Sequence, residues 1–455
     1  MTTIAAIATS HGSGGVSIIK ISGKNAFDVA AKCFFPYRTS LKEAQGGQAL
    51  VGKVVRDGVT IDEAVAVVWH APRSYTGEDT VEFNCHGGVA LTREVLALVL
   101  ESGAILAQPG EFTRRAYLNG KITLSQAESV IDLVNAENLA QIKVAAGGTV
   151  GRLSRKIDAI RGSLTAALAQ SYVFTDYADE DLVDLTPEQL VDTFDKNRQE
   201  LNLLLRSYKN AQPILTGVNT VIVGKPNTGK SSLLNMILGH DRAIVSPYAG
   251  TTRDTIEERV ALGEVTLRIT DTAGIRNSSN PIEQEGIRRS MDKLNSAELI
   301  LCVLDSSAPL DDEDNELLDL VSESSARKIA LLNKADLPLM IDISASGNTF
   351  DKVRHISAAT GEGLDGLQSA IEELFIKGAI DYSTDAILTS VRAESSALRA
   401  RDSLAEAITA LQNNSPVDLA CLHAEEALSA LDDLDGRGVS GQIIDSIFST
   451  FCVGK

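Results

Sequence analysis

Cysteine and positive charge are both scarce in this sequence of 455 residues. Its five cysteines are widely scattered and lack the close spacing of metal ligands, so reduced thiols in a cytoplasm are favoured over disulfides. They are Cys33, Cys85, Cys302, Cys421 and Cys452. Lys and Arg number 42 against 61 Asp and Glu, and the net charge of −19 argues against a broad electrostatic grip on nucleic acid. Any RNA contact is therefore expected to use a local basic patch.

The sequence also shows no pattern typical of a membrane-spanning or targeting segment. No apolar run approaches the roughly 20 residues of a membrane-spanning helix, and no charged and apolar leader opens the chain. A first strand is predicted from about Ile4, which leaves no room for a transit peptide, so we expect a bacterial, cytoplasmic protein. The hydrophobic content of 44% is typical of soluble proteins, and the length suffices for about three domains.

The central part of the chain opens with a phosphate-binding pattern. A β-branched run at 218–223 predicts a buried strand, and GKPNTGKS at 224–231 fits a P-loop between strand and helix. Lys230 is expected to reach the β and γ phosphate oxygens, and Ser231 to ligate Mg²⁺. Taken alone, the same residues also fit an ordinary turn.

Three further motifs follow in the order that a GTPase requires. GTTRD at 250–254 offers a threonine to Mg²⁺, and DTAG at 271–274 ends an apolar strand. NKAD at 333–336 ends another strand, where Asp336 can accept hydrogen bonds from an edge of guanine that adenine lacks. SAA at 357–359 is expected to back the base. The four motifs together predict a Ras-like GTP-binding domain, an α/β fold with a mostly parallel sheet.

The two flanks of this domain differ in pattern. Residues 1–120 alternate strand and helix signals and predict an α/β domain with a ligand role, although HGSGG at 11–15 fits a simple turn. Ala, Leu, Ser and Gln at helical spacing then predict helices on both sides of the GTPase motifs. The predicted helices are 125–140, 153–173, 187–208, 386–411 and 416–431, and an acidic loop at 176–184 has no assigned function. A helical domain interrupted by the GTPase unit is the economical interpretation, because Ras-like folds have neighbouring termini.

The residues for hydrolysis are only partly defined by the motifs. Typical GTPases carry a glutamine after DTAG to orient the attacking water, and Ile275 stands there instead. Glu283 could orient this water, but a carboxylate at the start of a helix explains it equally well. Asn227 and the polar loop 246–251 offer oxygen ligands to a monovalent cation, placed where other GTPases use an arginine finger.

Across its whole length the sequence resembles the MnmE (TrmE) family of bacterial tRNA-modification GTPases. The resemblance rests on GVSIIKISG, SYTGED, HGG, PGEFTRRAYLNGK, SQAES, GKPNTGKSS, GTTRD, DTAG followed by Ile-Arg, and the terminal FC-x-GK. Related GTPases share the central motifs but not the flanks. The family implies an α/β multidomain protein. Its parts are a folate-binding and dimerisation domain at 1–120, a helical domain at 121–214 and 379–455, and a Ras-like GTPase domain at 215–378.

The resemblance also implies a function. Family members form homodimers whose GTPase domains dimerise around K⁺, and they work with a FAD-containing partner, GidA (MnmG), as a heterotetramer. Together they add a carboxymethylaminomethyl-type group to carbon 5 of the wobble uridine, position 34, of certain tRNAs. A 5-formyl-tetrahydrofolate or related folate is the implied one-carbon donor, with GTP as substrate and K⁺ and Mg²⁺ as cofactors.

Site residues follow position by position from the resemblance. The implied K⁺ ligands are Asn227, Ser246, Tyr248 and Thr251, the Mg²⁺ ligands are Ser231 and Thr252, and the catalytic residue is Glu283. The implied folate ligands are Lys20, Glu82, Lys121 and Lys455, with Lys20 standing where arginine is common and therefore lacking its bidentate fork. Cys452 matches the family's terminal cysteine and is a candidate for the modification chemistry. The GTP-binding positions are Asn227, Thr228, Gly229, Lys230, Ser231, Ser232, Ser246, Pro247, Tyr248, Ala249, Gly250, Thr251, Thr252, Asp271, Thr272, Ala273, Gly274, Asn333, Lys334, Asp336, Ser357 and Ala358.

Two other functions are compatible with parts of the sequence. A ribosome-assembly GTPase of the Era or EngA type needs an RNA-binding appendage that is usually basic, whereas the flanks here are neutral to acidic. A folate-dependent one-carbon enzyme with an inserted regulatory GTPase differs only in its substrate, and the sequence leaves that alternative open.

Overall fold

The computed structural model describes residues 2–10, 12–176, 186–240, 257–270, 297–344, 349–376, 381–382 and 384–455. The chain divides into two compact units. The first unit comprises Met1–Ile131, Ser154–Phe194 and Asp402–Lys455, and the second comprises Asp132–Leu153 and Asp195–Arg401. Each unit contains a sheet and helices, so the predicted α/β multidomain fold is confirmed.

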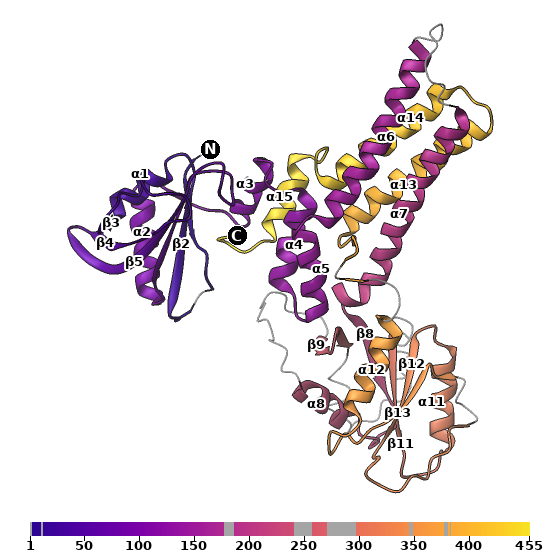
Figure 1. Cartoon of the computed structure of the whole chain (residues 1–455). Coiled ribbons are helices and arrows are strands. Elements are labelled where there is room, and N and C mark those ends of the chain that lie inside the picture. Colours follow the sequence, from indigo (N-terminus) through magenta and orange to yellow (C-terminus); the bar gives the residue numbers. More distant parts are fainter. Residues whose placement is uncertain are drawn as a thin grey trace. The chain divides into compact units, whose positions relative to one another are not determined.

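The first unit contains a sheet of seven described strands in the order β3-β4-β5-β6-β2-β1-β7. All neighbours are antiparallel except β1 and β7, which pair in parallel. Helices α1 (Ala26–Cys33) and α2 (Val89–Glu101) cover one face, where alternate residues of β2, β5 and β6 form the apolar core (Figure 1). The strands are β1 (Ile4–Ile7), β2 (Val16–Ser22), β3 (Phe34–Pro36), β4 (Ala49–Arg56), β5 (Val59–Trp69), β6 (Thr80–His86) and β7 (Ile105–Leu106).

The opposite face of this sheet carries polar residues and a third helix. Lys20 lies beside Ala6 of β1 on one side and Glu82 of β6 on the other, so the three residues share a face. Helix α3 (Glu111–Leu118) places Phe112 in a small buried cluster with Ile4 and Ala6. A charged pair and an aromatic ring are thereby brought together on the face away from α1 and α2.

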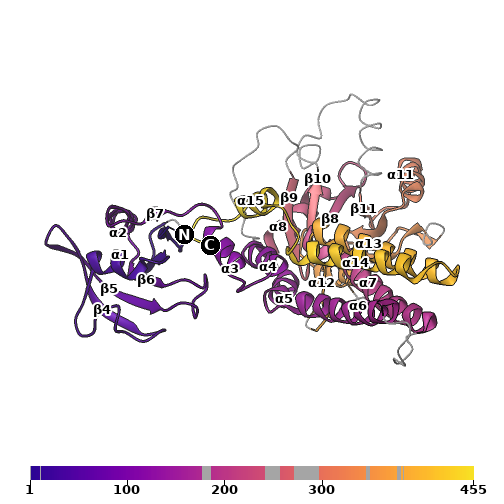
Figure 2. The ribbon, with the colours of Figure 1, turned by 90° about the horizontal axis from the view of Figure 1, so that it is seen from above.

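The remaining helices of the first unit come from both ends of the chain. Helix α6 (Arg152–Asp176) and helix α14 (Val417–Asp435) run side by side (Figure 1, Figure 2). Arg161 of α6 pairs with Asp432 and Asp435 of α14, at 3.0 Å each. Helix α15 (Gly441–Ser449) also lies in the first unit. Helices α4 (Leu124–Asn135), α7 (Pro187–Leu215) and α13 (Val391–Gln412) have residues in both units, and the first two residues of α6 belong to the second unit. Within the described ranges, no helix is both long and apolar enough to cross a bilayer.

The helix predicted over 125–140 is wrong, because two helices occupy this stretch. Helix α4 ends at Asn135, and α5 (Leu139–Thr149) begins after Asn138, whose backbone is extended and whose side chain accepts a hydrogen bond from the Gln141 N–H at 2.9 Å. The Asn138 amide also donates to the Thr266 hydroxyl at 3.0 Å. The apolar spacing continues across this break, so periodicity alone gave no sign of it. Similarly, α13 begins five residues later than predicted, at Val391.

The second unit contains a sheet of six described strands in the order β13-β12-β11-β8-β10-β9, and among these β10 and β9 pair antiparallel while the other neighbours pair in parallel. Alternate residues of β11 face opposite layers. Leu301 packs with helices α8 and α12, and Cys302 packs with helix α11. The elements are β8 (Val218–Val223), α8 (Lys230–His240), β9 (Glu257–Leu262), β10 (Val265–Thr270), β11 (Leu299–Asp305), α11 (Asp312–Glu323), β12 (Arg327–Asn333), β13 (Lys352–His355) and α12 (Leu364–Phe375).

Candidate functional site

The loop between β8 and α8 is shaped by two glycines that no other residue could replace. Gly224 has φ +155°, and a Cβ there would lie 2.4 Å from the Val303 carbonyl oxygen. Gly229 has φ +98°, and its Cβ would lie 2.1 Å from Asn333 Nδ2. Lys230 Nζ donates to the carbonyl oxygens of Gly224 at 2.7 Å and Lys225 at 2.5 Å, so its amine lies over this loop. Burial lowers the pKa of Lys230.

Asn333 connects the phosphate loop to the loop expected to back the base. Its side chain is buried, with Nδ2 donating to the Thr228 carbonyl at 2.7 Å and Oδ1 accepting from the Ala358 N–H at 2.9 Å. Three separate sequence motifs therefore meet at one amide. The first residue of NKAD therefore fixes the phosphate loop relative to the loop at 357–359, because its buried amide is bonded to both.

The rest of NKAD is also held by side-chain contacts. The Ser357 hydroxyl donates to Asp336 Oδ1 at 2.6 Å, which orients the carboxylate and leaves it capacity to accept further hydrogen bonds. Lys334, at φ +65°, pairs with Asp305 Oδ2 at 2.5 Å. Burial opposes the charge of Asp305, but hydrogen bonds from Lys334 and Ser307 outweigh it and hold the pKa of Asp305 below its usual value.

Lys225 makes a contact that the sequence motif does not predict. Its amine pairs with Asp311 and, at 2.8 Å, with Asp314. These two aspartates form the capping box at the start of α11. The phosphate loop is thus connected to the helix that follows β11.

Several predicted nucleotide-site residues lie outside the described residues, as do residues 177–184 of the acidic loop predicted at 176–184. They are Ser246, Pro247, Tyr248, Ala249, Gly250, Thr251, Thr252, Asp271, Thr272, Ala273, Gly274 and Glu283. Among the described ones, Asn227 is exposed at φ +64° and Ser231 and Ser232 are exposed in the first turn of α8. Oxygen atoms are the ligands that K⁺ and Mg²⁺ prefer. The amide oxygen of Asn227 therefore fits K⁺, and the hydroxyl of Ser231 fits Mg²⁺.

A second group of predicted residues meets on the open face of the first unit's sheet. Lys20 Nζ lies 4.7 Å from the centre of the Tyr75 ring and 5.3 Å from that of Phe112, and Glu82 Oε1 is 3.6 Å away. Burial lowers the pKa of Lys20, Glu82 opposes that change, and the positive charge of Lys455 adds to it. A cation between two rings and a carboxylate is suited to a flat, polar heterocycle such as the folate ring.

The end of the chain contributes to the same region. The Phe112 N–H donates to the Lys455 carbonyl at 3.1 Å, and the Gly110 N–H donates to the Cys452 carbonyl at 3.3 Å. Gly454 has φ +95°, and a Cβ there would lie 2.2 Å from the Ile7 carbonyl oxygen, so only glycine allows this approach. The terminal motif is therefore packed against β1 and α3, and Cys452 is exposed there.

Of the four predicted folate ligands, the structure brings together Lys20, Glu82 and the terminal segment that ends in Lys455. Lys121 instead donates to the Pro72 carbonyl at 3.0 Å, next to the loop that carries Tyr75. Tyr75 and Phe112 were not predicted from the sequence as site residues. Both lie in motifs that carried the family resemblance, SYTGED and PGEFTRRAYLNGK, which was the one signal that could have found them.

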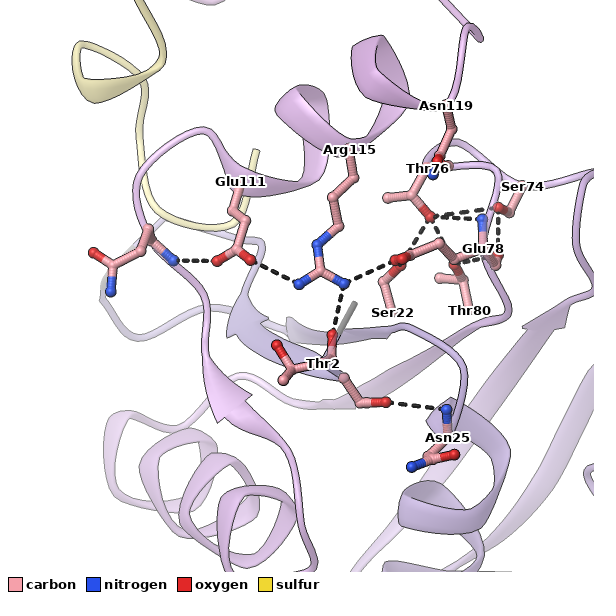
Figure 3. A network of polar contacts seen from close by, with 12 residues as sticks. Thr2, Ser22, Asn25, Ser74, Thr76, Glu78, Thr80, Glu111, Arg115 and Asn119 are labelled. Carbon is pink, nitrogen blue, oxygen red and sulfur yellow. Dashed lines mark hydrogen bonds and ion pairs between the residues drawn. The ribbon is translucent and has the colours of Figure 1, made fainter. Parts of the chain in front are cut away.

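A buried polar network joins these same two motifs (Figure 3). Arg115 Nη1 donates to the Thr2 carbonyl at 2.8 Å and to Glu78 Oε2 at 2.9 Å, and Nη2 donates to Glu111 Oε1 at 2.7 Å. The Ser22 hydroxyl also donates to Glu78, at 3.0 Å. No local sequence pattern indicates that these four segments meet.

Two family models match nearly the whole chain. Residues 3–121 match the model described as GTP-binding protein TrmE N-terminus, and residues 124–452 match the MnmE helical domain. Among solved structures, the G domain of the T. maritima FeoB iron transporter is similar over 34% of this chain and 97% of its own length, at 27% identity. Its TM-score of 0.26 is too low for that similarity to carry weight.

Three curated relatives described as tRNA modification GTPase MnmE align along the entire chain. The protein of Lachnoclostridium phytofermentans is 38% identical, that of Acetivibrio thermocellus 37% and that of Clostridioides difficile 39%. Each alignment covers 100% of this chain and 99% of the relative. Together with the nucleotide-site geometry, this similarity shows that the chain belongs to the MnmE (TrmE) family of tRNA modification GTPases.

Proposed function

We propose that this GTPase acts with a FAD-containing partner of the GidA (MnmG) type to modify carbon 5 of the wobble uridine, position 34, of certain tRNAs. The reaction is carboxymethylaminomethyl addition, with a 5-formyl-tetrahydrofolate type donor of the one-carbon unit. One observation carries the proposal. The same chain brings motifs for a guanine nucleotide together around Asn333, and it separately groups Lys20, two aromatic rings and the terminal segment in the first unit. A folate-dependent modification driven by GTP needs both.

In the nucleotide site, the described side chains bind and select GTP. Lys230 holds the β and γ phosphate oxygens, and Asp336 accepts the guanine N–H groups. Ser231 with Thr252 would hold Mg²⁺, and Asn227 with Ser246, Tyr248 and Thr251 would hold K⁺. When bound, these cations neutralise charge that develops on the phosphates. Glu283 orients the attacking water, the task that Ile275 cannot perform.

In the pocket of the first unit, Lys20 and Glu82 supply hydrogen-bonding groups and the rings of Tyr75 and Phe112 supply apolar contact to the folate ring. Lys121 and Lys455 offer positive charge to the carboxylates of folate. Lys121 Nζ donates to the Pro72 carbonyl in the loop before Tyr75, and the Lys455 backbone carbonyl accepts from the Phe112 N–H.

We also propose that two copies of this chain form a homodimer. The sheet face that carries Lys20 continues across β4 and β3, where Phe35, Tyr37 and Val51 are exposed by 51%, 53% and 54%. Three large apolar side chains on one exposed face are suited to a protein partner. A second copy of the chain covering this face would enclose the folate pocket.

Nucleoside analysis of tRNA tests the proposed function. A bacterial strain that lacks its own member of the family should lose the modified wobble uridine and regain it when this chain is expressed with its partner. The variant Glu283→Ala should not restore it. Unchanged wobble uridines in the deleted strain, together with accumulated ribosomal RNA precursors, would instead indicate a ribosome-assembly GTPase.

A further inference from the structure

We propose that Arg115 is a positioning residue for the folate site around Lys20, because its guanidinium joins chain segments that supply or adjoin the residues of that site. The inference deepens the proposed function and rests on it. Arg115 does not itself contact the Lys20 amine in the structure. It acts through Glu78, Glu111 and the backbone of Thr2 (Figure 3).

Each partner of Arg115 belongs to a segment that contributes to the pocket. Glu78 lies in the loop that carries Tyr75, and it also accepts a hydrogen bond from Ser22, two residues beyond Lys20 on the same face of β2. Thr2 immediately precedes the residues that lead into β1, against which the end of the chain packs. One side chain therefore connects β2, the start of β1 and the loop of Tyr75.

Helix α3 transmits the position of Arg115 to the two rings beside Lys20. Phe112 is three residues before Arg115, so both lie on the same side of this helix. The Thr113 hydroxyl is 2.9 Å from the Tyr75 hydroxyl, and the Phe112 N–H holds the Lys455 carbonyl. A shift of α3 would therefore move Phe112, Tyr75 and the terminal segment together.

The charge balance makes the guanidinium hard to replace. The side chains of Arg115, Glu78 and Glu111 are exposed by only 5%, 15% and 16%. Without the cation, two largely buried carboxylates would be left facing each other without a positive partner. They would separate or draw in water, and their negative charge would disfavour an anionic folate nearby. Lysine would keep the charge, but its single amine could not reproduce the forked contact with both carboxylates and the Thr2 carbonyl.

The experiment measures binding of 5-formyl-tetrahydrofolate to the full-length chain by calorimetry, with the GTP hydrolysis rate recorded for the same preparations. Arg115→Met should raise the Kd for folate by about tenfold or more, and Arg115→Lys by several-fold. The hydrolysis rate should stay within about twofold of wild type in both, because none of these contacts is made by nucleotide-site residues. Arg114→Met is the matched control, since the neighbouring Arg114 is 40% exposed and pairs with Asp445 at 2.8 Å; its Kd should not change.

A second substitution separates positioning from simple loss of stability. In Arg115→Met with Glu78→Gln, one of the two unpaired carboxylates is gone, so folate affinity should recover in part. Wild-type folate affinity in Arg115→Met would overturn the inference. If Arg115→Met does not fold, the folate affinity of Arg115→Lys is measured instead. Wild-type folate affinity in Arg115→Lys would likewise overturn the inference. Absence of folate binding by the wild-type chain would refute the folate assignment itself, and the inference with it.

Discussion

Replacing Asp336 by asparagine tests the basis of guanine selectivity in this GTPase. The Ser357 hydroxyl donates to Asp336 Oδ1 at 2.6 Å, and Asn333, in the same motif, is bonded on both sides. Asparagine has the same size and can still accept the hydrogen bond from Ser357. The substitution therefore changes one thing, an acceptor oxygen that becomes an NH₂ group facing the N1 and N2 donors of guanine.

The cost can be worked out from the hydrogen bonds that are lost. Each hydrogen bond to a charged group contributes about 1.5–3 kcal/mol, so losing two costs about 3–6 kcal/mol. Because 1.4 kcal/mol is a factor of ten, the Kd for GTP should rise by roughly 10² to 10⁴. Xanthine carries a carbonyl in place of the 2-amino group of guanine, so xanthosine triphosphate should bind the variant more tightly than it binds the wild-type chain.

Fluorescence titration with labelled GTP and xanthosine triphosphate measures both changes on the full-length chain. Asp351→Asn is the matched control, because it makes the same chemical change just before β13, where Asp351 pairs with Arg327 at 3.0 Å. That carboxylate lies at the amino end of the parallel strands, away from the nucleotide site at their carboxyl ends. GTP affinity within threefold of wild type in Asp336→Asn, with no gain for xanthosine triphosphate, would refute the assignment of NKAD.

Three other measurements test the remaining site residues. GTP hydrolysis should be several-fold faster in K⁺ than in Na⁺, and Asn227→Ala should remove this difference; equal rates in both salts for the wild-type chain would reject the cation site. Glu283→Ala should slow hydrolysis by about 10²-fold or more with little change in GTP affinity, and Ile275→Gln should not rescue it; near-normal turnover would exclude Glu283 as the catalytic residue. Because burial lowers the pKa of Lys20, this amine loses its proton at a lower pH than an ordinary lysine. Folate affinity should therefore fall as the pH rises into that range, and Lys20→Arg should move the loss to higher pH; a pH profile that is identical in the two proteins would count against a role for the Lys20 charge.

The nucleotide-binding strands and helices were predictable because their signals are local. The predicted strand 218–223 has the bounds observed for β8. A β-branched run that is followed directly by a glycine-rich loop predicts a buried strand that ends where the loop begins. The break at Asn138 was missed for the opposite reason, since the helical spacing continues through it while a contact with Thr266 stabilises the interruption.

By itself, the sequence determined the order of the motifs, the P-loop glycines and the residue types available for phosphate, guanine and folate. Only the tertiary structure decided which of them meet. Asn333 bonds Thr228 across 105 residues, and Arg115 bonds the Thr2 carbonyl across 113. The end of the chain packs beside β1 because Gly454 permits a close approach to Ile7. Such contacts depend on the path of the whole chain through its sheets, and no local pattern of propensity or periodicity contains that path.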